Sequence, residues 1–154
     1  FVNPDVSKRT FYYVTKLLAF NLDLNEIFHQ IYDEDLNITR LKGYVALNFT
    51  CTKNGLAYIK IDKKLCDKYL VTSSISNVLV NTLANIKLAK AWFVAIYDKH
   101  TGKVRISLRS KGIPINHIAE KYGGGGHKHA SGVIVNNFEI VAKLIIDLDK
   151  YLED

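Results

Sequence analysis

The fold and function of this chain depend on one stretch near its C-terminal end: Arg109-Ser110-Lys111-Gly112 and, after a short predicted helix, Gly123-Gly124-Gly125-Gly126-His127-Lys128-His129-Ala130-Ser131-Gly132. Glycine adds no side-chain packing and loses much conformational entropy on folding, so four in a row need a special reason. One reason is chemical, because backbone N–H groups without neighbouring Cβ atoms can close around phosphate oxygens. The flanking Arg109, Lys111, His127 and Lys128 are side chains of the types that bind phosphate.

A flexible linker is the alternative explanation of the glycine run. The surrounding sequence favours a binding site, because apolar-periodic segments flank the run closely, at 115–122 and 133–135. Six Lys and Arg residues but one acid lie between Thr101 and Ser131, in a chain whose net charge is +6. The sequence therefore predicts a phosphate-binding site formed by Arg109, Lys111, Gly124, Gly125, Gly126, His127 and Lys128.

The length and composition of the chain limit the kinds of protein to which it can belong. With 154 residues and 48% hydrophobic content, the chain can form one domain with a core and an additional connecting segment. It contains neither a membrane-spanning apolar run nor a signal-peptide pattern, so we expect a cytoplasmic location and no membrane contact. Cys51 and Cys66 form no CxxC pattern, which argues against a zinc site or a disulfide framework. Methionine is absent even from position 1, so we expect the chain to be a piece of a longer protein.

Two helices are predicted before the main domain. Phe11, Val14 and Leu18 recur at helical spacing. A second apolar stripe follows from Leu24 to Ile31, preceded by Asp23 as a candidate N-cap. We expect residues 1–36 to be a helical connector between domains and residues 37–154 to be the main domain. The alternative, in which both helices cover one face of the sheet, stays open.

Residues 37–154 predict a mixed α/β (α+β) domain with a sheet of about five strands flanked by helices. Strands are expected at 44–50 and 56–61 around an Asn-Gly turn, and at 91–97, 103–109 and 133–135. Helices are expected at 63–71, at 73–86, at 114–122 and at 138–152. Gly123 follows the third of these helices as its C-terminal glycine, which leaves the later glycines freer to bind a ligand.

Polar side chains are expected on one face of two of these elements. Along 103–109, strand alternation places Lys103, Arg105, Ser107 and Arg109 opposite the apolar residues, so that a basic row ends at Arg109. The helix at 73–86 carries Asn77, Asn81 and Asn85 opposite its apolar stripe. These amides are interpreted either as a solvated face or as groups that read the edge of a nucleobase.

No constellation with the spacing of a catalytic or metal site stands out. His127 and His129 are two residues apart but lack a third ligand, and no Ser/His/Asp or Cys/His arrangement is evident. We therefore predict neither catalytic nor metal-binding residues in this chain, and no cofactor.

The glycine stretch resembles a known family. The residues that carry the resemblance are Ser107-Leu108-Arg109-Ser110-Lys111-Gly112, then Ile118-Ala119-Glu120-Lys121-Tyr122 leading into Gly123 to Lys128 and Ala130-Ser131-Gly132. They are similar to the C-terminal, DHH-associated domain of DHH-family phosphoesterases, and most similar to the bacterial nanoRNase (oligoribonuclease)/pAp-phosphatase branch. The RecJ exonuclease branch usually has a shorter Gly-Gly-His, and the cyclic-dinucleotide phosphodiesterases tend to follow the histidine with Leu-Thr-Asn.

The resemblance implies a division of labour. Two divalent ions, usually manganese, would be held by an N-terminal domain with an Asp-His-His motif that this chain lacks. This domain would bind the substrate through Arg109 and the loop 123–127, and would hydrolyse nothing alone. The implied partners are short RNA or a nucleotide such as 3′-phosphoadenosine 5′-phosphate, the N-terminal domain of the same polypeptide and, in a homodimer, a second copy. Two alternatives stay open: a RecJ-like exonuclease substrate domain, and a non-catalytic nucleic-acid-binding module like the one appended to alanyl-tRNA synthetases.

Overall fold

The computed structural model describes residues 6–153, and the chain divides into two compact units, Phe1–Glu34 and Asp35–Asp154. The division falls close to the boundary predicted after residue 36. The first unit contains α1 (Lys8–Leu18) and α2 (Leu24–Tyr32). Asp23 caps α2 by accepting hydrogen bonds from the N–H groups of its first turn. None of the helices among the described residues is long and apolar enough to cross a bilayer.

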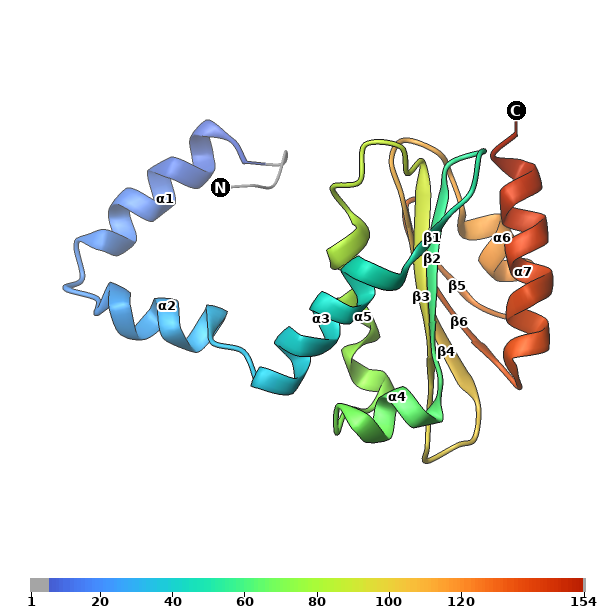
Figure 1. Cartoon of the computed structure of the whole chain (residues 1–154). Helices are drawn as coiled ribbons and strands as arrows, with labels where there is room; N and C mark the ends of the chain where they lie inside the picture. Colours follow the sequence, from blue (N-terminus) through green and yellow to red (C-terminus); the bar gives the residue numbers. More distant parts are fainter. Residues whose placement is uncertain (1–5, 154) are drawn as a thin grey trace. The chain divides into compact units, whose positions relative to one another are not determined.

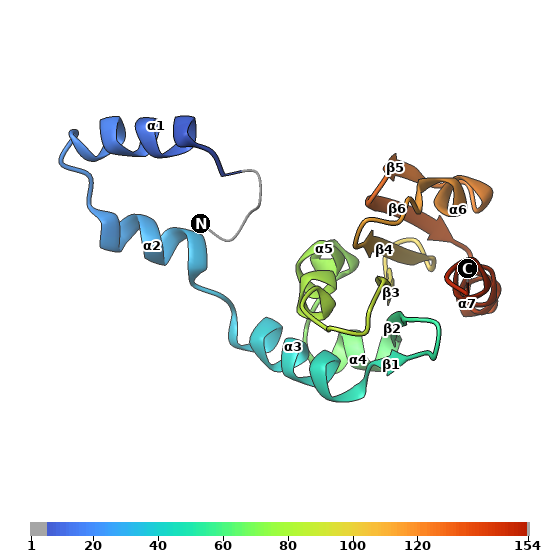
Figure 2. The same ribbon diagram turned by 90° about the horizontal axis from the view of Figure 1, so that it is seen from above.

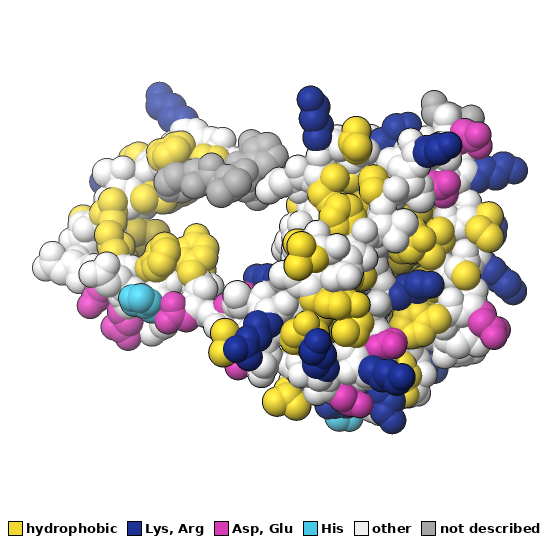
Figure 3. All heavy atoms as spheres, in the orientation of Figure 1, with side chains coloured by type: hydrophobic (Ala, Val, Ile, Leu, Met, Phe, Trp, Pro, Cys, Tyr) yellow, Lys and Arg dark blue, Asp and Glu magenta, His cyan; other side chains and the backbone are white. Residues whose placement is uncertain are grey.

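The helices α1 and α2 present their apolar side chains at the surface. Neither helix has a buried residue, and hydrophobic side chains gather on this unit in Figure 3. The largest exposed groups include Phe11, Tyr12, Phe20, Phe28, Ile31 and Tyr32. So much exposed apolar area is typical of a surface that another protein segment covers.

The second unit is built on one mixed sheet of six strands (Figure 1). In spatial order they are β1 (Thr50–Cys51), β2 (Leu56–Ile61), β3 (Ala91–Tyr97), β4 (Val104–Ser110), β6 (Ala130–Val135) and β5 (Gly125–His127). β2 and β3 are parallel, and all other neighbours are antiparallel. The predicted mixed α/β class is confirmed. The sheet has six strands rather than about five, because the end of the glycine run pairs with β6 as a strand.

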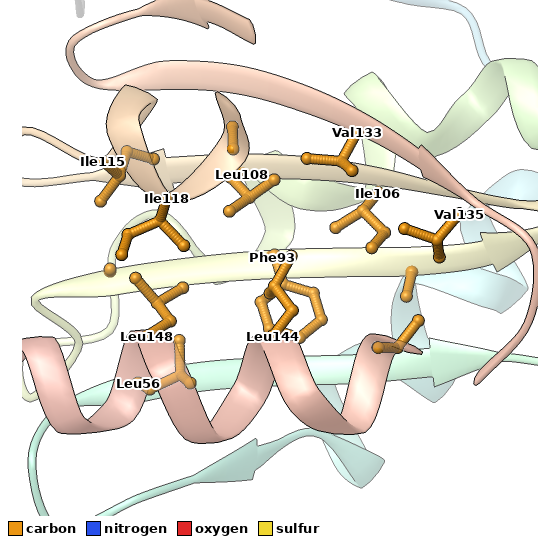
Figure 4. Packing of buried hydrophobic residues seen from close by; sticks show 14 of the residues in the cluster. Leu56, Phe93, Ile106, Leu108, Ile115, Ile118, Val133, Val135, Leu144 and Leu148 are labelled. Carbon is orange, nitrogen blue, oxygen red and sulfur yellow. The ribbon is translucent and has the colours of Figure 1, made fainter. Parts of the chain in front are cut away.

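Helices cover both faces of the sheet, as Figure 2 shows. One face is covered by α6 (Asn116–Lys121) and α7 (Phe138–Tyr151); the other carries α3 (Leu36–Asn48), α4 (Lys63–Lys68) and α5 (Ser76–Leu79), which is continued by 3₁₀ turns at Ser73–Ile75 and Val80–Leu83. Figure 4 shows the first core, in which Phe93, Ile106 and Leu108 of the strands meet Leu144 and Leu148 of α7. The second core lies on the α3–α5 side around Trp92, Val94 and Ile96.

Strand β3 has a buried side chain at nearly every position, as its continuous apolar run predicted. Strand β4 alternates as predicted, because Val104, Ile106 and Leu108 enter the first core while Arg105 and Arg109 are half-buried on the other face. The two cores therefore fix the direction in which the basic row of β4 points.

Two predicted elements are wrong. Residues 44–50 are not a strand: α3 continues to Asn48, with Leu41 and Val45 fully buried one turn apart, and only Thr50 and Cys51 pair with β2. The helix predicted at 73–86 is interrupted, and Val78 of its expected apolar stripe is 40% exposed. In both segments contacts with the sheet, rather than local propensity, decide the backbone conformation.

The two cysteines are free and differ sharply in exposure. Cys51 is exposed, whereas Cys66 is 1% exposed and its thiol donates a hydrogen bond to the Tyr97 carbonyl oxygen over 3.5 Å. Burial raises the pKa of the Cys66 thiol to about 11. Since the thiolate is the reactive form, Cys66 is expected to be inert in the folded protein at pH 8.

Ellman's reagent tests this expectation directly. At pH 8 the folded chain should release one equivalent of chromophore rapidly, and the second only in guanidinium chloride. Cys51→Ser should abolish the rapid phase. Two equally fast equivalents from the folded wild-type chain would contradict the burial of Cys66.

Candidate functional site

Strand pairing brings Arg109 and His127 to the same face of the sheet. Arg109 is paired with Ala130 across β4 and β6, and Ala130 is paired with His127 across β6 and β5. Directly opposite residues of antiparallel strands project on the same side. With neighbouring strands about 4.8 Å apart, the Cα atoms of Arg109 and His127 are separated by roughly 10 Å. The small side chain of Ala130 between them leaves room for an anion that both can contact.

The next row across the sheet is almost free of side chains. Ser107 of β4 is paired with Gly132 of β6, and Gly132 is paired with Gly125 of β5. Gly132 carries no side chain, so the backbone of β6 is open to solvent at this point. Arg105 and Ile134 form the row beyond it. The result is a cleft of about 550 Å³, whose polar lining consists of Asn77, Arg105, Ser107, Arg109, His127 and Ser131.

Among the residues that the structure describes, the arginines of this cleft have no acidic partner. Arg109 Nη1 donates to the carbonyl oxygen of the preceding Leu108 over 2.8 Å, and within residues 6–153 no carboxylate forms an ion pair with it. Burial lowers the pKa of the Arg109 guanidinium. Arg105 Nε is buried and has no hydrogen-bond acceptor among the described residues. A partly desolvated cation without a counter-charge is stabilised when an anion binds, so this cleft is suited to anionic ligands.

The first glycine of the run ends α6, as predicted. Gly123 has φ +74°, its N–H donates to the Glu120 carbonyl oxygen, and the Gly124 N–H donates to the Ala119 carbonyl oxygen, each over 2.9 Å. This is a Schellman motif with glycine at the left-handed position. Two of the N–H groups in the glycine run are therefore already used by the helix and are not free to surround a phosphate.

Two of the later glycines, which we expected to be freer to bind a ligand, also have a structural role. A Cβ on Gly124 would lie 2.2 Å from the Gly132 carbonyl oxygen and 2.7 Å from Val133 Cγ2. Gly126 has φ +140°, and its Cβ would lie 2.6 Å from the Ala130 carbonyl oxygen. A Cβ on Gly125, by contrast, would meet no atom within 4 Å. The glycine run thus lets β5 lie against β6.

Of the seven predicted site residues, three line the cleft: Arg109, Gly124 and His127. Lys111 lies elsewhere, because its Nζ donates to the Ile86 carbonyl oxygen over 2.7 Å and sits 5.6 Å from the centre of the Trp92 ring. Lys128 lies in the turn between β5 and β6, where its own carbonyl oxygen accepts a hydrogen bond from the Ile115 N–H. Gly125 and Gly126 are in β5 but do not line the cleft.

The cleft also contains residues that were not predicted as site residues. Arg105 and Ser107 belong to the basic face that strand alternation indicated, so a signal for them was present. Asn77 lines the cleft from α5, whereas Asn81 and Asn85 do not. Periodicity alone could not separate these three amides, because only the contact of α5 with β4 places one of them beside the site.

Two arginines, Arg105 and Arg109, stand among the polar side chains of the cleft, and a guanidinium has no lone pair to give to a metal ion. Among residues 6–153, no group of three or more His, Cys, Asp or Glu side chains is placed to hold a metal ion.

Comparison with known proteins finds relatives over most of the chain. The DHHA1 domain family matches residues 55–154. The "Bifunctional oligoribonuclease and PAP phosphatase NrnA" of Bacillus subtilis is 33% identical over 149 residues, covering 97% of this chain and 47% of that protein. The chain thus spans about half the length of the curated relatives it matches. The resemblance inferred from the glycine stretch is confirmed.

Two solved structures show the same fold. An exopolyphosphatase-related protein from Bacteroides fragilis superposes with a TM-score of 0.81 at 25% identity, over 96% of this chain and 46% of its own. The C-Ala domain of Aquifex aeolicus alanyl-tRNA synthetase superposes with a TM-score of 0.53 at 12% identity, over 70% of this chain and 99% of its own. At that identity, the second likeness concerns the fold alone.

Proposed function

Because the chain belongs to the DHHA1 domain family, we propose that it is the substrate-binding part of a phosphoesterase that hydrolyses short oligoribonucleotides and 3′-phosphoadenosine 5′-phosphate. The observation that carries this proposal is the row Arg109–Ala130–His127, which presents two phosphate-binding side chains over an open floor. The substrate class is supported by the name of the Bacillus subtilis relative, an oligoribonuclease and PAP phosphatase.

In this proposal the chain contributes binding, and another part of the same polypeptide contributes the chemistry. Two divalent ions, such as manganese, would be held there and would stabilise the charge that develops on the scissile phosphate. The exposed apolar side chains of α1 and α2 offer a surface for that part to cover. The free cysteines fit the expected cytoplasmic location.

The cleft would bind one phosphate group strongly and would place few restrictions on the rest of the ligand. The Arg109 guanidinium donates charge-assisted hydrogen bonds to two phosphate oxygens, and His127 reaches the same group from the other side. Gly132 contributes no side chain to the floor of the cleft, which leaves room for the backbone of a nucleotide. Tyr122 is the aromatic residue of the basic stretch, and its hydroxyl donates to Asp147 instead of facing the cleft. A site without stacked rings favours short ligands.

The dependence of affinity on salt and on RNA length tests the proposal. Each phosphate contact contributes a slope of about −0.7 to log K against log salt, so a few contacts should give roughly −1.5 to −3. Lengthening the RNA from a few nucleotides to about twenty should leave the affinity of the chain nearly unchanged. A slope of about −6, or affinity that climbs with length, would instead indicate a groove for long strands, as in the RecJ-like alternative. Fluorescence anisotropy with end-labelled RNA measures both quantities.

A further inference from the structure

We propose that Asn77 is a ligand-binding residue of the cleft, whose side-chain NH₂ donates a hydrogen bond to a phosphate oxygen of the bound nucleotide. This inference rests on the proposed function. Asn77 would then bind the ligand, whereas Asn81 and Asn85 of the same 73–86 segment would not.

The orientation of the Asn77 amide is set by Ser107. The Ser107 hydroxyl lies 2.9 Å from Asn77 Oδ1 and 3.0 Å from Ser76 Oγ, and it shares its single proton between these two acceptors. Ser76 and Ser107 are buried, so these contacts are shielded from solvent. Because Oδ1 faces Ser107, the amide nitrogen on the other branch is turned away from Ser107.

The Asn77 amide nitrogen is left as a free donor beside the cleft. No hydrogen-bond partner of Nδ2 occurs in the part of the chain that the structure describes, and the residue is exposed. Ser107, to which Asn77 is bonded, lies midway between Arg105 and Arg109 on the same face of β4. Alternate residues of a strand are about 6.8 Å apart, so the amide stands within reach of an anion held by Arg109.

Donors from three separate elements then surround one anion: Asn77 from α5, Arg109 from β4 and His127 from β5. Phosphate oxygens accept several hydrogen bonds each, whereas the cleft offers few acceptors in return. An amide donor beside a guanidinium therefore matches a phosphate oxygen better than it matches a donor group of a base.

A purely structural role of Asn77 would require only part of its side chain. A tether between α5 and β4 needs only the oxygen that accepts from Ser107. Asn77→Asp keeps that oxygen and the shape of the side chain but replaces the NH₂ donor with a second, negatively charged acceptor. The substitution thus separates the two roles without removing the contact with Ser107.

The experiment is a titration of the chain with 5′-phosphorylated diadenylate, followed by ¹⁵N–¹H NMR so that weak binding can be measured. We expect Asn77→Asp to raise Kd by at least about tenfold, and Asn77→Ala by roughly threefold to tenfold. The additional loss in Asn77→Asp is repulsion between like charges, so it should shrink as salt is raised. Asn81→Asp is the matched control, because it makes the same change of charge on an exposed asparagine outside the cleft, and its Kd should change by less than about twofold.

Each outcome decides the proposal. Wild-type affinity in Asn77→Asp would show that Asn77 only tethers α5 to β4. If Asn77→Asp and Asn77→Ala lose the same affinity with the same salt dependence, the amide lies away from any phosphate. That result would also overturn the proposal. Failure of the proposed function is distinguished by Arg109→Ala: if the wild-type chain does not bind the dinucleotide, or if Arg109→Ala binds equally well, the phosphate site itself is absent. Thermal melting checks that the exposed position 77 tolerates each change.

Discussion

Arg109→Ala is expected to lower the affinity of the chain for a 5′-phosphorylated dinucleotide by about tenfold to a hundredfold, since a hydrogen bond to a charged group contributes ~1.5–3 kcal/mol. The guanidinium is partly desolvated and has no carboxylate partner among the described residues, so a bound phosphate would compensate its charge. Arg109→Lys should recover only part of the affinity, because lysine cannot form the two parallel hydrogen bonds of a guanidinium. Titration by NMR or calorimetry measures these differences.

The matched control for Arg109 is Arg40, an exposed arginine of α3 that lies outside the cleft. Arg40→Ala makes the same change in net charge and should leave Kd within about twofold. An equal loss in both variants would mean that the overall positive charge, not the cleft, attracts the ligand. His127→Ala should weaken binding to a similar degree as Arg109→Ala, and the double variant by less than the two losses combined, because both side chains contact one group.

Gly124→Ala is expected to destabilise the domain by about 2–3 kcal/mol, which corresponds to a fall in Tm of roughly 4–12 °C. Its Cβ would lie 2.2 Å from a backbone oxygen of Gly132, so strand β5 would have to move away from β6. The neighbouring Gly125→Ala makes the same chemical change where a Cβ meets nothing within 4 Å. It should leave Tm unchanged or raise it slightly, because alanine restricts the unfolded chain.

Circular dichroism or calorimetric melting of the two glycine variants separates two explanations of the run. If the glycines serve only as a nest for phosphate, both variants should have the Tm of the wild type. They should then differ from the wild type only in their affinity for the dinucleotide. Equal destabilisation by both would contradict the open space at Gly125 and the pairing of β5 with β6 described above.

Local sequence patterns predicted the structure correctly where the spacing of apolar residues follows the burial of one face of a helix or strand. The alternation of β4 predicted that Arg105 and Arg109 lie opposite the core, and the glycine after α6 was identified as its C-terminal cap. The motif around the glycines was sufficient for the family. These features succeed because each is set by residues a few positions apart, whose preferences the rest of the fold does not reverse.

The same patterns failed where several conformations suit one short apolar segment. Residues 44–50 are rich in types common in strands, yet Val45 packs in a helix because Leu41, one turn earlier, is buried against the same side of the sheet. Lys111 was predicted to bind phosphate from its position beside Arg109. The chain turns after β4, however, and brings its Nζ to the Ile86 carbonyl oxygen, about which the local sequence holds no information.

The sequence by itself therefore determined the fold class and the family, and it singled out Arg109 and His127, which the structure places in one cleft. Tertiary structure alone decided which glycines are needed for the approach of β5 to β6, and which of three asparagines stands beside the site. Both depend on contacts between segments that lie far apart in the sequence, such as the hydrogen bond between Asn77 and Ser107 thirty residues later. The periodicity of a sequence predicts which face of a helix or strand is polar. Which residues that face contacts depends on how the helices and strands pack against one another.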